Sequence, residues 1–153
     1  IENFDILSKL TSLKDLSLKG TKIQNLDFLT SLSRLGYLNL INTKINDLSP
    51  IKDLILLNYI ALINTDVKDV NSLKNLGNLK YLYAGGLNVK NWSSIKDLKE
   101  IECIDFRNVP IEDLSILLEL PKLKILYISK DNNYPKEQLD KLFKKKGLKI
   151  EMS

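Results

Sequence analysis

The residue types that carry most enzyme chemistry are scarce in this chain. It has no histidine and a single cysteine, Cys103. Without histidine, neither a Ser-His-Asp nor a Cys-His relay can form, and the commonest protein ligand of transition metals is missing. One cysteine forms no internal disulfide and no CxxC pair. The sequence therefore predicts no catalytic site, no metal site and no bound cofactor.

Two other features invite a chemical interpretation. Cys103 has no activating base near it in the sequence pattern, so an inert cysteine is favoured over a nucleophile. We expect its thiol to face solvent, which is more typical of a reducing compartment and favours the cytoplasm over the cell surface or secretion. Asp47, Asp69 and Asp113 recur at multiples of 22 residues. They could form a carboxylate ladder for cations, but turn residues that bond their own backbone are the favoured interpretation.

The pattern that positions these side chains is a repeat of 22 residues. Each unit opens with a leucine and carries the apolar phrase L-x-x-L-x-x-L-x-L or a close variant. The six opening leucines are Leu10, Leu32, Leu54, Leu76, Leu98 and Leu120. A fixed period in this range, with a short strand pattern in each unit, is the signature of stacked leucine-rich repeats. Positions are counted below from each of these leucines as position 1.

Each repeat places seven apolar positions inward: 1, 4, 7 and 9 around a predicted strand, and 14, 17 and 20 on the return. Burying seven such side chains contributes on the order of 10–20 kcal/mol. Ordering 22 residues costs about 1.5 kcal/mol each, so one repeat cannot fold alone and must stack. Trp92 occupies position 17, and we predict that it is buried near Ala84.

Position 18 carries Asp, Ser or Asn in every unit, and these residue types favour the start of a helix. The residues are Asp5, Asp27, Ser49, Asn71, Ser93 and Ser115. We predict that their side chains cap the short helices. The sequence thus predicts an α/β fold: a right-handed, curved leucine-rich-repeat solenoid with a parallel sheet on its concave side and short helices or turns on its convex side.

Residues 1–153 are predicted to form one domain, with a partial first repeat and six repeats over 1–130 and a C-terminal cap over 131–153. In the cap, Leu139, Leu142 and Phe143 have helical spacing, and Gly147 ends the helix. A final strand follows with Leu148, Ile150 and Met152 alternating. The run from Lys144 to Lys146 is interpreted as a solvated face that complements a helix C-terminus. The first ten residues match residues 23–32, so we expect the chain to begin within a repeat.

The whole chain resembles the 22-residue subclass of leucine-rich-repeat proteins, which includes the bacterial internalins and a regulatory subunit of a protein phosphatase. N-T-K-I-N-D-L-S-P-I, from Asn42 to Ile51, is closest to the bacterial pattern. The resemblance implies a protein-binding module that uses its concave strand face. One position departs from the family, because its turn asparagine is replaced by Thr21, Thr43, Thr65, Leu87 and Val109. We expect the last two turns to be looser or to depend on Asn88 and Asn108.

Tyrosines gather at the outward strand positions 6 and 8. Five of the six fall there, namely Tyr37, Tyr59, Tyr81, Tyr83 and Tyr127. Ile41 and Ile63 at position 10 lie beside them, and Asp105 and Arg107 lie toward one end. An aromatic centre with a polar rim is typical of protein interfaces. The alternative is that tyrosine simply favours strands, but no phenylalanine occupies these positions.

We therefore predict a non-enzymatic module that binds a protein partner through its tyrosine-rich concave face. One alternative is a homodimerising or structural scaffold whose concave patch is self-covered. Another is a cytosolic inhibitor or immunity-type regulator of an enzyme or toxin. The net charge of +4 comes almost entirely from scattered lysines, which argues against nucleic acid. No apolar run approaches the roughly 20 residues that cross a bilayer, so membrane insertion is not expected.

Overall fold

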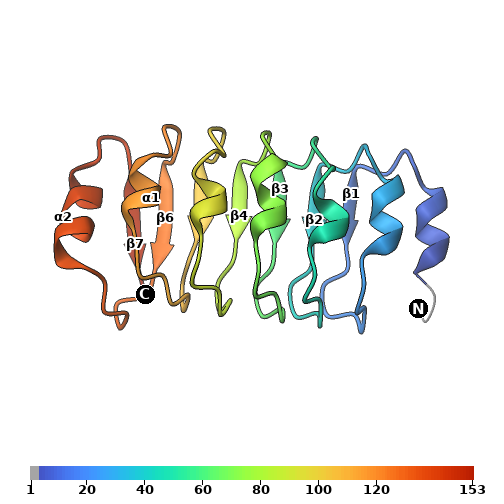
Figure 1. Ribbon diagram of the computed structural model, residues 1–153, viewed down its shortest axis with the longest axis horizontal. Helices are drawn as coiled ribbons and strands as arrows, with labels where there is room; N and C mark the ends of the chain where they lie inside the picture. The colour runs from blue at the N-terminus through green and yellow to red at the C-terminus, as the bar shows by residue number, and fades with distance from the viewer. Residues whose placement is uncertain (1–3) are drawn as a thin grey trace.

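Figure 1 shows a computed structural model in which similar coils stack in a row, with helical turns on one side and strands on the other. The structure describes residues 4–153. The inward position predicted for Ile1 lies outside the described residues. The two ends of the chain lie toward opposite ends of the row.

One parallel sheet holds the described strands in chain order. The strands are β1 (Asp15–Ser17), β2 (Tyr37–Asn39), β3 (Tyr59–Ala61), β4 (Tyr81–Tyr83), β5 (Cys103–Asp105), β6 (Ile125–Ile128) and β7 (Lys149–Met152). Tyr37 pairs with Tyr59, and Tyr59 pairs with Tyr81. The uniform repeat length thus places equal positions of neighbouring repeats side by side.

Short helical elements form the opposite side of the stack. The 3-10 turns are η1 (Asp5–Lys9), η2 (Asp27–Ser31), η3 (Ser49–Ile51), η4 (Asn71–Asn75) and η5 (Ser93–Ile95), and the α-helices are α1 (Ser115–Leu118) and α2 (Lys136–Lys144). Among residues 4–153, no helix is long and apolar enough to span a membrane. The predicted solenoid of strands and short helices is confirmed.

The seven predicted inward positions form the hydrophobic core. At position 1, the leucines from Leu32 onward are at most 2% exposed, whereas Leu10 is 48% exposed at the end of the described stack. Trp92 is 2% exposed, which confirms its predicted burial. Its ring centroid lies 4.4 Å from that of Phe106, and its Nε1 donates to the Val89 carbonyl at 3.0 Å.

The prediction that side chains at position 18 cap the helical turns is wrong. The side chain that bonds the start of η2, η3, η4, η5 and α1 lies two residues earlier, at position 16. Residues at position 18 are the first residues of the helical turns, and the residue before each of them, at the cap position itself, is apolar and makes no side-chain cap bond. Instead, the position 16 side chain accepts the position 18 backbone N–H, at 2.7–3.3 Å, in Asn25, Asp47, Asp69, Asn91 and Asp113. An Asp or Asn side chain reaches a backbone N–H two residues on when the chain bends between them. This confirms the structural interpretation of the three aspartates.

The turns after the strands of repeats four and five are closed like the others. Leu87 and Val109 are buried, and their N–H groups donate to the position 9 carbonyls at 3.1 and 3.2 Å. In the first five repeats the left-handed residue is position 11, namely Gly20, Asn42, Asn64, Gly86 and Asn108, with φ between 55° and 78°. Glycine and asparagine tolerate this conformation best. The turns therefore depend on position 11, and the expected looseness is not observed.

The predicted C-terminal helix and strand are α2 and β7. β7 pairs in parallel with β6, Leu142 is fully buried, and Gly147 has a φ of 80°. Phe143, which shares the helical spacing of Leu139 and Leu142, is 54% exposed. The helix packs through Leu139 and Leu142, and the adjacent Phe143 projects away from that stripe.

Two side chains of the cap segment bind the ends of α1. The Nζ of Lys145 donates to the carbonyls of Leu117, Leu118 and Leu120 at 3.1, 2.9 and 2.7 Å. Burial lowers the pKa of this ammonium. At the other end, Gln138 Oε1 accepts the Leu114 N–H at 2.7 Å. Lys145 thus complements a helix C-terminus as expected, but it is partly buried, whereas its neighbours in the run are exposed.

Candidate functional site

The outward strand positions form two columns on the sheet face, which is the surface predicted to be concave. Position 6 carries Asp15, Tyr37, Tyr59, Tyr81, Cys103 and Ile125, and position 8 carries Ser17, Asn39, Ala61, Tyr83, Asp105 and Tyr127. Lys149 and Glu151 of β7 pair with the last residue of each column. The register brings all five predicted tyrosines onto this face.

Four of these tyrosines form one continuous group, the tyrosine cluster of Tyr37, Tyr59, Tyr81 and Tyr83. The rings of Tyr37 and Tyr59 stack with centroids 4.3 Å apart. Tyr59 also lies 5.3 Å from Tyr83 and 6.3 Å from Tyr81. Tyr81 is the most exposed member, at 38%. Because the rings already hold one another in place, a partner would order them at little entropic cost.

The tyrosine cluster combines its rings with hydroxyl groups that can form hydrogen bonds. Burial raises the pKa of both Tyr59 and Tyr83, so neither ionises near neutral pH. Asn39 Nδ2 donates to the Tyr37 hydroxyl at 3.3 Å. The surface therefore combines apolar ring faces with hydrogen-bonding hydroxyls, a combination that suits protein recognition.

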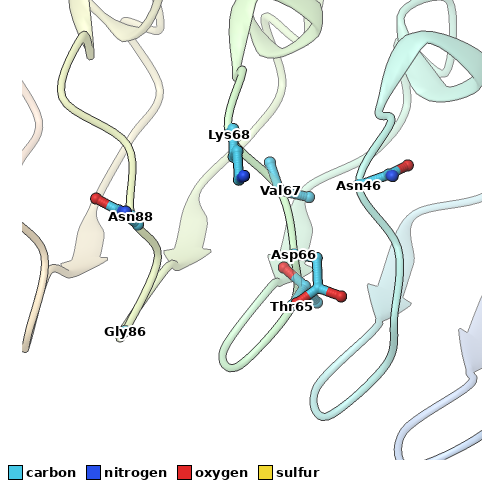
Figure 2. A pocket seen from close by; sticks show the side chains of 7 residues that line it. All are labelled: Asn46, Thr65, Asp66, Val67, Lys68, Gly86 and Asn88. Carbon is cyan, nitrogen blue, oxygen red and sulfur yellow. The ribbon is translucent and has the colours of Figure 1, made fainter.

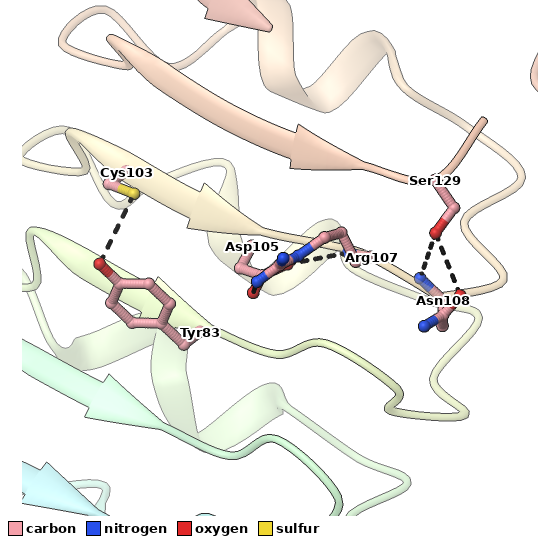
Figure 3. A network of polar contacts seen from close by, with 6 residues as sticks. All are labelled: Tyr83, Cys103, Asp105, Arg107, Asn108 and Ser129. Atoms are coloured by element: carbon pink, nitrogen blue, oxygen red, sulfur yellow. Dashed lines mark hydrogen bonds and ion pairs between the residues drawn. The ribbon is translucent and has the colours of Figure 1, made fainter. Parts of the chain in front are cut away.

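Cys103 occupies the predicted column but is only 4% exposed, so the expected solvent-facing thiol is wrong. Figure 3 shows Tyr83 leaning from β4 toward this residue, and the thiol lies 4.0 Å from the Tyr83 hydroxyl. Burial raises the pKa of the thiol, which keeps it protonated and weakly reactive. The inert interpretation is supported, and the compartment argument that rested on exposure no longer applies.

Asp105, which was predicted to lie at a polar rim, is 1% exposed. Its Oδ1 accepts the backbone N–H and the Nε of Arg107, each at 3.0 Å, and its Oδ2 accepts Nη2 at 2.7 Å (Figure 3). Burial is tolerated because the charge is paired with a guanidinium fork. Arg107 also lies over the Tyr127 ring, 5.3 Å from its centroid. Asp105 thus orients Arg107, and its own carboxylate is not accessible to a partner.

The predicted patch therefore divides into two parts. The tyrosine cluster is flanked by Ile41 and Ile63, which are both half-buried. Arg107 and Tyr127 form a second unit toward the C-terminal end, and no ring contact joins Tyr127 to the cluster among residues 4–153. At the same end, the Ser129 hydroxyl accepts the Asn108 N–H at 2.9 Å and so links β6 to the turn after β5 (Figure 3).

A depression of about 550 Å³ lies on the loops that follow β2, β3 and β4. Its lining residues are Asn46, Thr65, Asp66, Val67, Lys68, Gly86 and Asn88. Figure 2 shows Asn46, Lys68 and Asn88 on three separate loops. Thr65 bonds its own turn and Asp66 pairs with Lys44 at 3.7 Å, so no reactive group is presented there. The described part of the chain holds no group of three His, Cys, Asp or Glu residues that could bind a metal ion.

The sequence-based prediction omits Ile55 and Leu56, which are 57% and 49% exposed. They lie on the loop that runs into β3, outside the strand columns. The signal was present in the repeat grid, because no other repeat places a large aliphatic residue at positions 2 and 3.

Comparison with known proteins finds relatives by structure alone. No protein-family model and no curated protein matches this chain. It is similar to internalin C2 of Listeria monocytogenes, with 25% identity and a TM-score of 0.88 over 99% of this chain. A second internalin of that bacterium (inlF) has 23% identity and a TM-score of 0.76 over 98%. A leucine-rich-repeat protein of Leptospira interrogans has 16% identity and a TM-score of 0.76 over 96%.

The chain spans 66%, 50% and 45% of the lengths of these three proteins. The likeness nevertheless covers nearly all of this chain, including its terminal coils. It also agrees with the 22-residue period, the single parallel sheet and the stacked helical turns. The chain therefore has an internalin-like leucine-rich-repeat fold.

Proposed function

We propose that this chain is a non-enzymatic module that binds a protein partner on its sheet face. The observation that carries this proposal is the tyrosine cluster, in which Tyr59 contacts the rings of Tyr37, Tyr81 and Tyr83. The core does not require these side chains, since the inward positions of the same strands are filled by Leu38, Ile60 and Leu82. Pre-ordered aromatic rings on a rigid sheet are typical of binding hot spots.

The experiment is a comparison of alanine variants on the two sides of the solenoid. Once a partner has been captured by pull-down, we expect Tyr59→Ala and Tyr81→Ala each to reduce affinity by about 2 kcal/mol or more. Lys52→Ala and Lys74→Ala, on the helical side, should leave the affinity unchanged. Loss of affinity only in the lysine variants would move the site to the other side.

Folding stability is the control for the same variants. Removing one ring of a stacked pair costs about 0.5–1.5 kcal/mol beyond its area, so the thermal midpoint should fall only modestly. Tyr81→Ala, at the most exposed ring, should change it least. The self-covering alternative predicts a mass that rises with concentration and a dimer that Tyr81→Ala dissociates, as measured by sedimentation velocity.

A further inference from the structure

Ile55 and Leu56 form an exposed aliphatic pair in the middle of the solenoid. At positions 2 and 3 the other repeats carry Thr11-Ser12, Ser33-Arg34, Gly77-Asn78, Lys99-Glu100 and Pro121-Lys122. The flanking Leu54 and Leu57 fill the inward positions and are 2% and 0% exposed. The pair therefore contributes little to the core, and folding does not explain it.

The loop that carries the pair is held in place. The Ile55 N–H donates to the Asp53 carbonyl at 2.9 Å. The Ile55 carbonyl accepts Nδ2 of Asn78, from the next repeat, at 2.8 Å. The two side chains are thus presented by an ordered backbone, which reduces the entropy lost when a partner covers them.

The pair stands four and three residues before Tyr59 of the tyrosine cluster, on the loop that runs into β3. We call the loops that run into the strands, at positions 2, 3 and 5, the leading edge. Gly36 stands at this edge directly before Tyr37, and a Cβ placed on it would lie 3.7 Å from the Leu56 carbonyl and 3.3 Å from Asn58 Nδ2. The backbone before Tyr37 therefore runs close to the backbone of the loop that carries the pair.

The leading edge carries an excess of positive charge. Its cations are Lys14, Arg34, Lys80, Lys99, Lys122 and Lys124, and its carboxylates are Glu100 and Glu102. Glu100 pairs with Lys122, and Glu102 pairs with Lys80 and Lys124. Both carboxylates are therefore already engaged by lysines on the C-terminal side of the pair. On the N-terminal side, Lys14 and Arg34 are exposed and add two more cations. A second copy of this chain would meet like charge here, whereas an acidic surface is complementary.

We propose that the partner is an acidic, folded protein domain that covers the tyrosine cluster, reaches over the leading edge and receives Ile55 and Leu56 in an apolar pocket. This inference rests on the proposed function. We infer a folded domain because the pair lies on a loop outside the strands that carry the cluster, and a single extended segment along the sheet face would leave the aliphatic pair exposed.

The test uses site-specific photocrosslinking. Benzoylphenylalanine is placed at Tyr81, at Leu56 and, as a control on the helical side, at Lys74. Each chain is irradiated in an extract of the source organism. We expect one acidic protein to crosslink from Tyr81 and from Leu56 but not from Lys74.

Affinity for that recovered protein is then measured with the full chain. Ile55→Ser and Leu56→Ser should each weaken binding at least about tenfold, while Phe143→Ser, at an equally exposed apolar residue of the cap, should not. Arg34→Glu should weaken binding most at low salt, and Lys74→Glu should have little effect. Thermal midpoints of the serine variants should match the unmodified chain, because both side chains are exposed.

The outcomes separate this inference from the proposed function. A crosslink from Tyr81 without one from Leu56 overturns the inference and leaves the proposed function standing. No crosslink from either position overturns both. A recovered protein with a basic binding surface, or unchanged affinity in both serine variants, also overturns the inference.

Discussion

Individual Asp and Asn side chains at position 16 hold the start of η2, η3, η4, η5 and α1. Asp47 Oδ1 accepts the Ser49 N–H at 2.8 Å, and its Oδ2 accepts the Ser49 hydroxyl at 2.7 Å. The backbone bond lowers the pKa of Asp47, with a further contribution from the hydroxyl. Asn25 and Asn91 make the same backbone bond without a charge. The acceptor oxygen is therefore the shared requirement.

Asp47→Ala is expected to reduce the free energy of unfolding by about 1 kcal/mol, as the loss of a helix cap does. Asp47→Asn should keep most of that stability at pH 7. Because the folded pKa lies below the unfolded value near 4, the stabilisation is present above pH 4 and is lost as the pH falls through the folded pKa. Urea unfolding at pH 7 and pH 3 measures both effects. Equal destabilisation by Asn and Ala at pH 7 would contradict this role.

Trp92 is the second residue whose surroundings give a direct prediction. Replacing it by alanine removes the contact with Phe106 and is expected to cost about 3–5 kcal/mol. Trp92→Phe should cost less, but it leaves the Val89 carbonyl without its donor. The native fluorescence should be blue-shifted and resist acrylamide. Emission resembling that of free tryptophan would show that the ring is not packed.

Cys103 and Asp105 show which residue-scale features the sequence could not provide. The 22-residue period places both on the outward side of β5, and that assignment is correct. Their burial depends on where neighbouring side chains point. Tyr83, on the adjacent strand β4, points toward Cys103, and the Arg107 side chain turns back to bond Asp105. The alternation of inward and outward positions along a strand does not specify these side-chain directions. The exposure of an outward residue therefore cannot be inferred from its column alone.

At the scale of elements, α2 stabilises α1 by binding both of its ends. A four-residue helix has few internal hydrogen bonds of its own, so most of its terminal groups need outside partners. Lys145 supplies donors to three carbonyls, and Gln138 supplies an acceptor to the Leu114 N–H. The sequence predicts the cap from its helical spacing, but this link joins residues more than 20 positions apart, which local patterns do not reveal.

Lys145→Met is expected to reduce the free energy of unfolding by about 1–3 kcal/mol, because charge-assisted bonds are lost and three carbonyls lose their donor. Lys144→Met and Lys146→Met are matched controls, since both side chains are exposed, and should change stability by less than about 0.5 kcal/mol. Hydrogen exchange should accelerate first in α1 and α2. Equal losses of unfolding free energy from all three substitutions would show that the bonds from Lys145 to α1 make no specific contribution.

At the scale of the whole molecule, stability varies along the stack because each coil contacts only its neighbours. The central core leucines are almost completely buried, whereas Leu10 is 48% and Ile6 is 63% exposed at one end. The opposite end is covered by α2 and β7. The two ends of the described stack therefore differ in how completely their apolar residues are covered.

Native-state hydrogen exchange should be slowest in β3, β4 and β5 and fastest in η1 and β1. Opening that begins at the less buried end exposes the least additional apolar surface, so its free energy is lowest. The measurement is exchange of backbone amides followed by mass spectrometry of peptides. Uniform protection from β1 to β7 would show that the stack opens as one cooperative unit.

The uniform pitch of the stack also has a genetic consequence. Duplication or loss of one 22-codon unit, in frame, changes the sheet by a single strand, or about 4.8 Å. Every inward column stays in register, because position 1 of the new unit again meets position 1 of its neighbours. A change of one or two residues between positions 1 and 9 would instead move leucines out of the inward columns. Recombination between repeats can therefore lengthen or shorten the sheet face in whole steps without redesign of the core.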